Sequence, residues 1–135
     1  SVDGGLMVPC IKKCDEKNLL GICRELNAIV KKSRNKTIEP DDLQGSTFTL
    51  SNFGIFGATI GTPIINQPNV GILGTGEIKK QPVVIEKNDT DVIAIRQIMA
   101  LSLGFDHRLI DGAGGAKFLL EIKNNLENLN FENLL

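Results

Sequence analysis

The chemistry that this sequence could perform centres on its single histidine. His107 lies four residues before Asp111, in the segment Asp-His-Arg-Leu-Ile-Asp-Gly. A neutral imidazole suits general-base catalysis near neutral pH, and a lone one could take a proton from a thiol or a hydroxyl. Such a base needs a hydrogen-bond donor for the oxyanion that develops on the substrate. Ser51 is the candidate donor, because it lies on the polar side of a predicted strand, just before a glycine-rich loop.

Each of these side chains also has a purely structural interpretation. His107 would be an ordinary turn residue, and Asp111 would be the N-cap of the helix that follows, where a cap contributes about 1 kcal/mol. Ser51 would be a surface serine that ends a strand. For an isolated His-x-x-x-Asp pattern the structural interpretation outweighs the catalytic one, so the rest of the sequence has to decide.

The other groups that could carry chemistry are cysteines and glycines. Cys10, Cys14 and Cys23 fall short of the four ligands of a structural zinc site. We interpret them as reduced, packed thiols of an intracellular protein, and we predict no metal site. The Gly-Ile-Leu-Gly-Thr-Gly segment over 71–76 resembles a dinucleotide-binding loop. That function needs a helix directly after the loop, and residues 77–82, which end in a proline, cannot form one.

Composition excludes several classes of protein. A chain of 135 residues suits one domain with a substantial core. Its 15 basic and 16 acidic side chains give a net charge of −1, whereas a nucleic-acid binder normally has a basic excess. No apolar run approaches the roughly 20 residues of a membrane-spanning helix, and the N-terminus lacks a signal-peptide pattern. We therefore expect a cytoplasmic protein, or one of the mitochondrial matrix if the source is eukaryotic.

The elements that must position His107 and Ser51 follow from the hydrophobic pattern. We predict strands over 6–11, 47–51, 70–78, 82–86 and 92–105, and helices over 15–32 and from Gly115 onward. The long strand over 92–105 pairs with the strand over 82–86 and delivers the residues around His107 to the edge of the sheet. This order predicts an α+β fold, a sandwich in which helices cover a mixed sheet.

The pattern also predicts where elements begin and which sides they bury. Asp15 is the expected N-cap of the first helix. Phe48 and Leu50 form the apolar face of the strand that ends at Ser51. The apolar side of the last helix contains Ala116, Leu119, Leu120, Lys123 and Leu126. We expect the apolar loop over 52–61 and the leucine-rich end over 126–135 to contact neighbouring subunits.

Several blocks of this sequence together resemble one family. The segment 106–112 matches the Asp-His-Arg-x-x-Asp-Gly signature of the acyltransferase component of 2-oxo acid dehydrogenase complexes. The agreement extends to Phe-Thr-Leu-Ser-Asn (48–52), Thr-Pro-Ile-Ile-Asn-Gln-Pro (62–68), Gly-Leu-Met-Val-Pro (5–9) and Ile-Leu-Gly (72–74). Because these blocks occur in order and span nearly the whole chain, the resemblance is specific.

The resemblance implies a fold like that of chloramphenicol acetyltransferase, in trimers that build a large cage with active sites at subunit interfaces. It implies transfer of an acyl group between acyl-dihydrolipoamide and coenzyme A, which is a substrate. In this role His107 removes the thiol proton, and Ser51 of the adjacent subunit stabilises the oxyanion. Asp111 supports the site through hydrogen bonds or ion pairs. The implied partners are the 2-oxo acid decarboxylase component and dihydrolipoyl dehydrogenase; no coenzyme A-binding residue is assigned.

The family's catalytic domain is longer than this chain. Residues 1–135 therefore resemble its C-terminal part, without its N-terminal part, the lipoyl domain or the subunit-binding domain. Succinyl-transferring relatives tend to have Thr in place of Ser51, and Arg-Glu where this chain has Ala113-Gly114, which favours an acetyl or branched-chain acyl group here. Two other functions stay open: a structural core fragment without activity of its own, and an antibiotic O-acetyltransferase.

Overall fold

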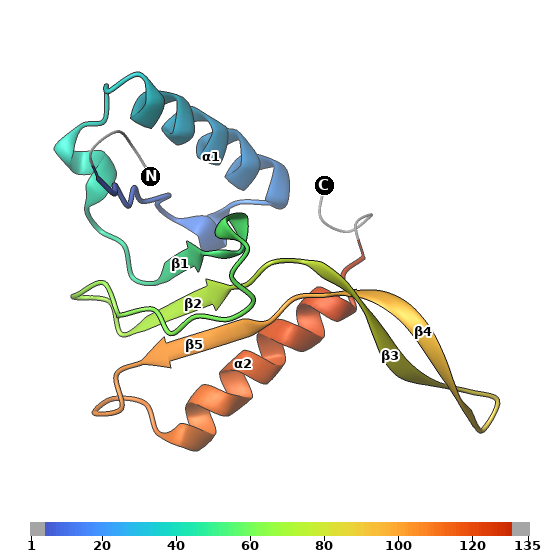
Figure 1. Ribbon diagram of the computed structural model, residues 1–135. Helices are drawn as coiled ribbons and strands as arrows, with labels where there is room; N and C mark the ends of the chain where they lie inside the picture. Colours follow the sequence, from blue (N-terminus) through green and yellow to red (C-terminus); the bar gives the residue numbers. More distant parts are fainter. Residues whose placement is uncertain (1–4, 131–135) are drawn as a thin grey trace. The chain divides into compact units, whose positions relative to one another are not determined.

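The structure, a computed structural model, describes residues 5–130 and divides into two compact units. The first unit comprises the residues up to Thr47 and those from Asn124 onward, and the second comprises Phe48–Lys123. Residues 131–135 of the predicted leucine-rich contact surface lie outside the described part. The elements in chain order are η1 (Cys14–Glu16), α1 (Leu19–Arg34), η2 (Pro40–Leu43), β1 (Thr49–Asn52), η3 (Gly54–Phe56), β2 (Gly71–Thr75), β3 (Lys79–Lys87), β4 (Thr90–Ile98), β5 (Leu101–Phe105) and α2 (Gly112–Glu127) (Figure 1).

Helix α1 of the first unit begins later than predicted. Its N-cap is Asn18, whose side-chain oxygen accepts a hydrogen bond from the Gly21 N–H at 2.9 Å. Asp15 instead lies in the short 3₁₀ helix η1, so the prediction of Asp15 as the cap is wrong. The physical reason is that Lys17 and Asn18 are extended, and this separates η1 from α1.

Helix α1 ends in a left-handed turn. Lys36 has a φ of 59°, and the Thr37 N–H donates to the Lys32 carbonyl at 2.9 Å while the Lys36 N–H donates to the Ser33 carbonyl at 3.3 Å. This pair of bonds is a Schellman motif, which satisfies carbonyls that the helix end would otherwise leave free. The helix therefore ends at Arg34, two residues beyond the predicted Lys32.

The predicted strand over 6–11 does not form. Gly5 makes an isolated bridge, and residues 6–13 have no regular structure. The Cys10 N–H does donate to the Asp42 carbonyl at 2.7 Å. Because Asp42 lies in the 3₁₀ helix η2 rather than in a strand, this bond cannot continue into a ladder.

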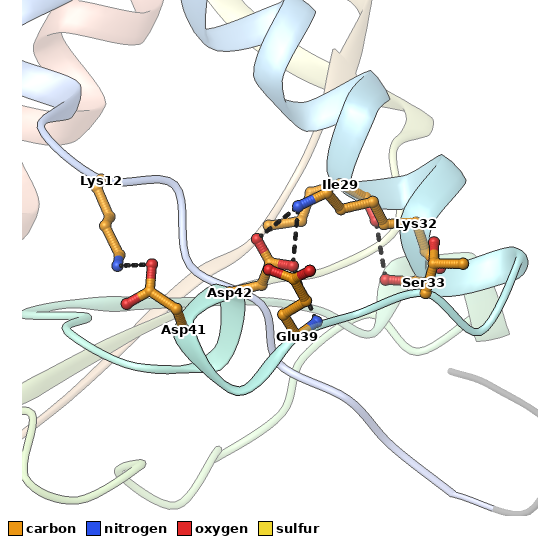
Figure 2. A network of polar contacts seen from close by, with 8 residues as sticks. Lys12, Ile29, Lys32, Ser33, Glu39, Asp41 and Asp42 are labelled. Atoms are coloured by element: carbon orange, nitrogen blue, oxygen red, sulfur yellow. Dashed lines mark hydrogen bonds and ion pairs between the residues drawn. The ribbon is translucent and has the colours of Figure 1, made fainter.

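Ion pairs connect two lysines of the first unit to η2 (Figure 2). Lys12 Nζ lies 2.7 Å from Asp41 Oδ2, and Lys32 Nζ lies 3.0 Å from Asp42 Oδ1. The Glu39 N–H also donates to Asp42, at 3.0 Å. This backbone hydrogen bond and the Lys32 ammonium lower the pKa of the Asp42 carboxyl below its usual value. Asp42 is the N3 residue of η2, and its carboxylate forms a capping box with Glu39, the N-cap.

The second unit contains a mixed sheet, which confirms the predicted α+β class. Strands are ordered β1-β2-β5, with β1 parallel and β5 antiparallel to β2. Strands β3 and β4 form a separate antiparallel hairpin, as predicted for the segments around 82–86 and 92. The prediction of one long strand over 92–105 is wrong. The chain leaves the hairpin at Met99 and Ala100, where the Ala100 carbonyl accepts the Gly76 N–H at 2.9 Å, and then joins a different sheet as β5.

The buried sides of β1 and α2 also differ from those predicted. Thr49 is buried and its Oγ1 accepts a hydrogen bond from Asn69 Nδ2 at 2.8 Å, whereas Leu50 is 65% exposed. In α2 the buried residue is Gly115, where an added Cβ would clash with the ring of Phe105. Of the predicted apolar side only Leu119 is half-buried, and the other four residues are exposed. A glycine contact leaves no apolar signal in a sequence, so most of the packed side was mispredicted. No described helix has the length and apolar character needed to cross a membrane.

Candidate active site

His107 lies in a tight turn directly after β5. The Asp106 N–H donates to the Val70 carbonyl at 2.9 Å, and the Leu109 and Ile110 N–H groups both donate to the Asp106 carbonyl at 3.0 Å. The imidazole is exposed and packs on Phe105, with 5.6 Å between ring centroids. Neither ring nitrogen has a hydrogen-bond partner within residues 5–130. Both nitrogens are therefore available to a substrate or to another chain.

Asp106 and Arg108 brace the turn on either side of the histidine. Arg108 Nε donates to Asp106 Oδ1 at 2.9 Å and Nη2 donates to Oδ2 at 2.6 Å, while the Arg108 N–H donates to Oδ1 at 3.0 Å. These hydrogen bonds from Arg108 lower the pKa of Asp106 to about 2. Fork-like pairing of this kind holds geometry as well as charge. The pair therefore fixes the backbone that carries His107.

We expect the Arg108→Gln substitution to raise the pKa of Asp106 from about 2 towards 3.8. Because the folded-state pKa lies below the unfolded one, the pair stabilises the fold above about pH 4, and this stabilisation is lost as the pH falls towards 2. The stability difference between the two proteins should therefore be constant near neutral pH and vanish in acid. Carboxyl NMR titration and denaturant unfolding at several pH values measure both effects.

Arg96→Gln provides the control for this substitution, because Arg96 contacts the Ile95 carbonyl on the hairpin and should leave the pKa of Asp106 unchanged. An Asp106 pKa that stays near 2 in Arg108→Gln would show that Arg108 does not hold the turn.

Asp111 forms the N-cap of α2. Its Oδ1 accepts the Gly114 N–H at 2.6 Å, and its carbonyl accepts the Gly115 N–H at 3.0 Å. This is the structural interpretation of Asp111 made from the sequence, and it starts the helix three residues before the predicted Gly115. The cap fixes where the His107 turn passes into the helix.

Ser51 lies at the opposite end of the sheet from His107. In the register Ser51 pairs with Gly74, and Gly74 pairs with Ser102. Phe105 pairs with Gly71 at the other end, and His107 lies two residues beyond it. At about 3.3 Å per residue, the strand from Ser102 to Phe105 alone spans about 10 Å. One chain therefore does not bring the Ser51 hydroxyl and the His107 ring together.

The surroundings of Ser51 leave its hydroxyl unused. The hydroxyl makes no hydrogen bond with the described part of the chain. Next to it, an added Cβ at Gly74 would lie 2.6 Å from Ser102 Oγ and 2.7 Å from the ring of Phe53. Ser102 Oγ is buried and has no hydrogen-bond partner among residues 5–130. Because Gly74 has no side chain, the Ser102 hydroxyl fits beside it, in the same line of paired residues across the sheet as Ser51.

Two contributors to this region were missed in the sequence. Ser102 could have been found because it shares the strand that leads to His107, but the pairing that aligns it with Ser51 is not visible in a sequence. Arg108 could have been found from its spacing of two residues from Asp106, which allows a local ion pair.

An apolar cavity lies behind the histidine, between α2 and the sheet. Its volume is about 190 Å³, and its lining includes Phe48, Leu103, Phe105 and Phe118. Phe105 therefore both packs on the His107 ring and lines the cavity. The rings of Phe48 and Phe118 pack edge to face at 5.9 Å.

The cysteines take no part in this region. All three are free thiols; Cys10 is half-buried, but Cys14 and Cys23 are exposed, so the prediction of packed thiols is wrong for the latter two. Across residues 5–130 no group of three or more His, Cys, Asp or Glu side chains could hold a metal ion. The chemistry of the described site thus rests on an imidazole, a carboxylate and hydroxyls.

Comparisons with known proteins identify the family of the chain. The family described as 2-oxoacid dehydrogenases acyltransferase (catalytic domain) matches residues 1–135. The dihydrolipoyllysine-residue acetyltransferase component of the pyruvate dehydrogenase complex of Corynebacterium glutamicum is 44% identical over 128 residues, which cover 95% of this chain and 19% of that protein. The succinyltransferase component of the 2-oxoglutarate dehydrogenase complex of Bacillus subtilis is 41% identical over 128 residues, which cover 95% of this chain and 30% of that protein.

Solved structures show the same fold. A probable dihydrolipoamide acetyltransferase from Listeria monocytogenes matches with a TM-score of 0.88 and 41% identity, over 98% of this chain and 55% of that one. Azotobacter vinelandii dihydrolipoamide acetyltransferase, studied for the role of a serine, a histidine and an asparagine in its mechanism, matches with a TM-score of 0.86 and 36% identity, over 96% of this chain and 51% of that one. The cubic core of a pyruvate dehydrogenase multienzyme complex matches with a TM-score of 0.86 and 36% identity, over 96% and 51%.

The chain belongs to the 2-oxoacid dehydrogenase acyltransferase family, which confirms the resemblance found in the sequence. The predicted fold is confirmed as well, because the structural relatives are catalytic cores of the same family. The chain spans less than a third of the length of these two curated relatives and about half of the solved chains.

Proposed function

We propose that this chain is the C-terminal part of a catalytic domain that transfers an acyl group between dihydrolipoamide and coenzyme A. The observation that carries the proposal is the braced turn after β5 in a chain of this family. It presents an imidazole whose two nitrogens have no hydrogen-bond partner in the part of the chain that the structure describes. The family assignment gives no support to the alternative of an antibiotic O-acetyltransferase.

The roles of the residues follow from their chemistry. His107 takes the proton of the coenzyme A thiol, and the thiolate attacks the carbonyl carbon of the acyl-dihydrolipoamide thioester. The resulting oxyanion accepts a hydrogen bond from Ser51. When the tetrahedral intermediate collapses, acyl-coenzyme A forms, and the departing dihydrolipoamide thiolate takes the proton from His107. No redox step or metal ion is needed for this balance.

Ser51 and His107 act together across two copies of the chain in this proposal. The support is the register, which holds the two residues at opposite ends of one sheet. A structural relative has been studied for a serine, a histidine and an asparagine, and that asparagine lies four positions after the histidine. Asp111 occupies this position relative to His107. A neutral side chain can also cap a helix, so we assign Asp111 a hydrogen-bonding role rather than proton transfer.

Assembly and acyl specificity belong to the same proposal. We infer a trimer within a larger core that works with a 2-oxo acid decarboxylase and dihydrolipoyl dehydrogenase; the support is the likeness to a cubic core. The curated relatives include an acetyltransferase and a succinyltransferase at similar identity. Ser51 and the Ala113-Gly114 pair favour an acetyl or branched-chain acyl group.

An acyl-transfer assay on the intact protein tests the proposed function. The protein is mixed with dihydrolipoamide and acetyl-, isobutyryl- or succinyl-coenzyme A, and formation of the new thioester is followed. We expect transfer of the acetyl or isobutyryl group with a higher kcat/KM than that of the succinyl group. Preferred transfer of the succinyl group would contradict the acyl assignment, and an assembled protein that transfers none of the three would contradict the function and favour a purely structural core.

A further inference from the structure

Ser102 Oγ is the one buried side-chain polar atom that has no hydrogen-bond partner among residues 5–130. Burying a hydroxyl without a partner costs folding free energy, so such a group in a folded protein needs an explanation. None of the steps of the proposed acyl transfer uses this hydroxyl. The explanation has to come from what surrounds Ser102 on the sheet.

The side chain of Ser102 leans from β5 over β2. Facing Cβ atoms on neighbouring strands are ordinarily about 4.5–5.5 Å apart, but Ser102 Oγ lies 2.6 Å from the point that a Cβ of Gly74 would occupy. Strand β2 lies between β5 and β1 (Figure 1), and Gly74 pairs with Ser51 on its other side. The Ser102 hydroxyl therefore reaches across the glycine towards Ser51.

The three strands give Ser102 no other free hydroxyl on this face of the sheet. By register and alternation, the face consists of Thr49, Ser51, Ile72, Gly74, Ser102 and Gly104. The Thr49 hydroxyl is already bonded to Asn69 Nδ2, at 2.8 Å. Ser51, like Ser102, has no hydrogen-bond partner in the described part of the chain. The two unpaired hydroxyls of this face thus flank the same glycine.

The ring of Phe53 keeps bulk water away from Ser102. Its Cε1 lies 2.7 Å from the point that a Gly74 Cβ would occupy, and 2.9 Å from the corresponding point at Gly61. Ser102 Oγ is buried in this setting. A hydrogen bond is stronger where water is excluded, because the effective dielectric constant is low. A hydrogen bond from Ser102 to Ser51 would therefore be stronger than one on an open surface.

We propose that Ser102 is a positioning residue for Ser51. The inference rests on the proposed function, in which the Ser51 hydroxyl donates to the oxyanion. A serine hydroxyl without a partner rotates among three staggered side-chain conformations. With substrate bound, a hydrogen bond from Ser102 to Ser51 Oγ, direct or through one water, selects one of them and leaves the Ser51 proton for the oxyanion.

Removal of the Ser102 hydroxyl tests this role in the intact protein. We expect Ser102→Ala to lower kcat about three- to tenfold, the usual contribution of one hydrogen bond. The KM for dihydrolipoamide and for the preferred acyl-coenzyme A should not change, because the bond serves the transition state. In the Ser51→Ala background the same substitution should leave the residual kcat unchanged, because Ser102 acts only through Ser51. A merely structural role would lower kcat by the same factor in both backgrounds.

Thr75→Val is the matched control for this substitution. Thr75 follows Gly74 in β2, so its side chain lies on the opposite face of the sheet from Ser51 and Ser102. Loss of this hydroxyl should leave kcat at the wild-type value.

Urea unfolding at equal protein concentration gives a measurement that needs no substrate. Because Ser102 Oγ has no partner within residues 5–130, the unfolding midpoint of Ser102→Ala should lie at or above that of the wild type. A lower midpoint, an unchanged kcat, or an equal loss in the Ser51→Ala background would each overturn the positioning role. A wild type that transfers no acyl group would contradict the proposed function and this role together, whereas any of those three results with an active wild type would contradict this role alone.

Discussion

Replacement of His107 by alanine is expected to lower the rate of acyl transfer by about 10²- to 10⁴-fold, the usual contribution of a general base. His107 is the only histidine in the chain, so no second imidazole can take over the thiol proton. The side chain is exposed and makes no hydrogen bond with the described residues. Its loss should therefore leave the fold and the mass of the assembled protein unchanged. Steady-state kinetics and light scattering measure the two effects.

Added imidazole provides the control for this substitution. A small base that enters the space left by the side chain should restore part of the kcat of His107→Ala and leave the wild-type rate unaffected. A His107→Ala protein with wild-type turnover would remove His107 from the mechanism. An inactive variant of altered mass would point instead to a structural defect.

Mixing two inactive variants is expected to restore activity if the site is shared between copies. Ser51→Ala and His107→Ala each remove one half of the site. In a mixed ring, a Ser51 from the His107→Ala chain can meet a His107 from the Ser51→Ala chain. Random mixing of equal amounts should make roughly a quarter of the sites intact, because each head-to-tail interface draws its two halves independently. Unfolding and refolding the variants together, followed by the acyl-transfer assay, measures the recovery.

The chain that carries both substitutions is the control for this experiment. Mixed with Ser51→Ala or with His107→Ala, the double variant supplies neither missing half, so no activity should return. Absence of recovery in the mixture of the two single variants, at a mass that shows mixed assembly, would place both residues in one chain. That result would disagree with the register of β1, β2 and β5.

The parts of the fold that depend on local pattern were predictable. The expected pairing of the segment 82–86 with the alternating residues from Val92 onward located the β3–β4 hairpin, and helical spacing located α1 and α2. The strand over 6–11 was mispredicted because its apolar residues have no strand to pair with among residues 5–130. The break at Met99 and Ala100 was missed because the apolar alternation continues from β4 into β5, while the pairing partners change.

Candidate site residues could be proposed from the sequence, but the contacts that hold them in place could not. His107, Ser51 and Asp111 were selected by their chemistry and by the family motif. Arg108 and Asp106 are only two positions apart, but how many hydrogen bonds they form depends on how the turn is folded. The burial of Ser102 depends on Gly74, whose missing side chain makes the space for it. Such effects of an absent side chain leave no positive signal in a sequence.

The placement of Ser51 and His107 at opposite ends of one short sheet determines when a newly made copy can become active. Under the proposed function, a newly made copy holds one half of each of two different catalytic centres and completes neither. Such a copy cannot consume thioesters while it is still solitary. Under this proposal, catalysis begins only after two copies have come together.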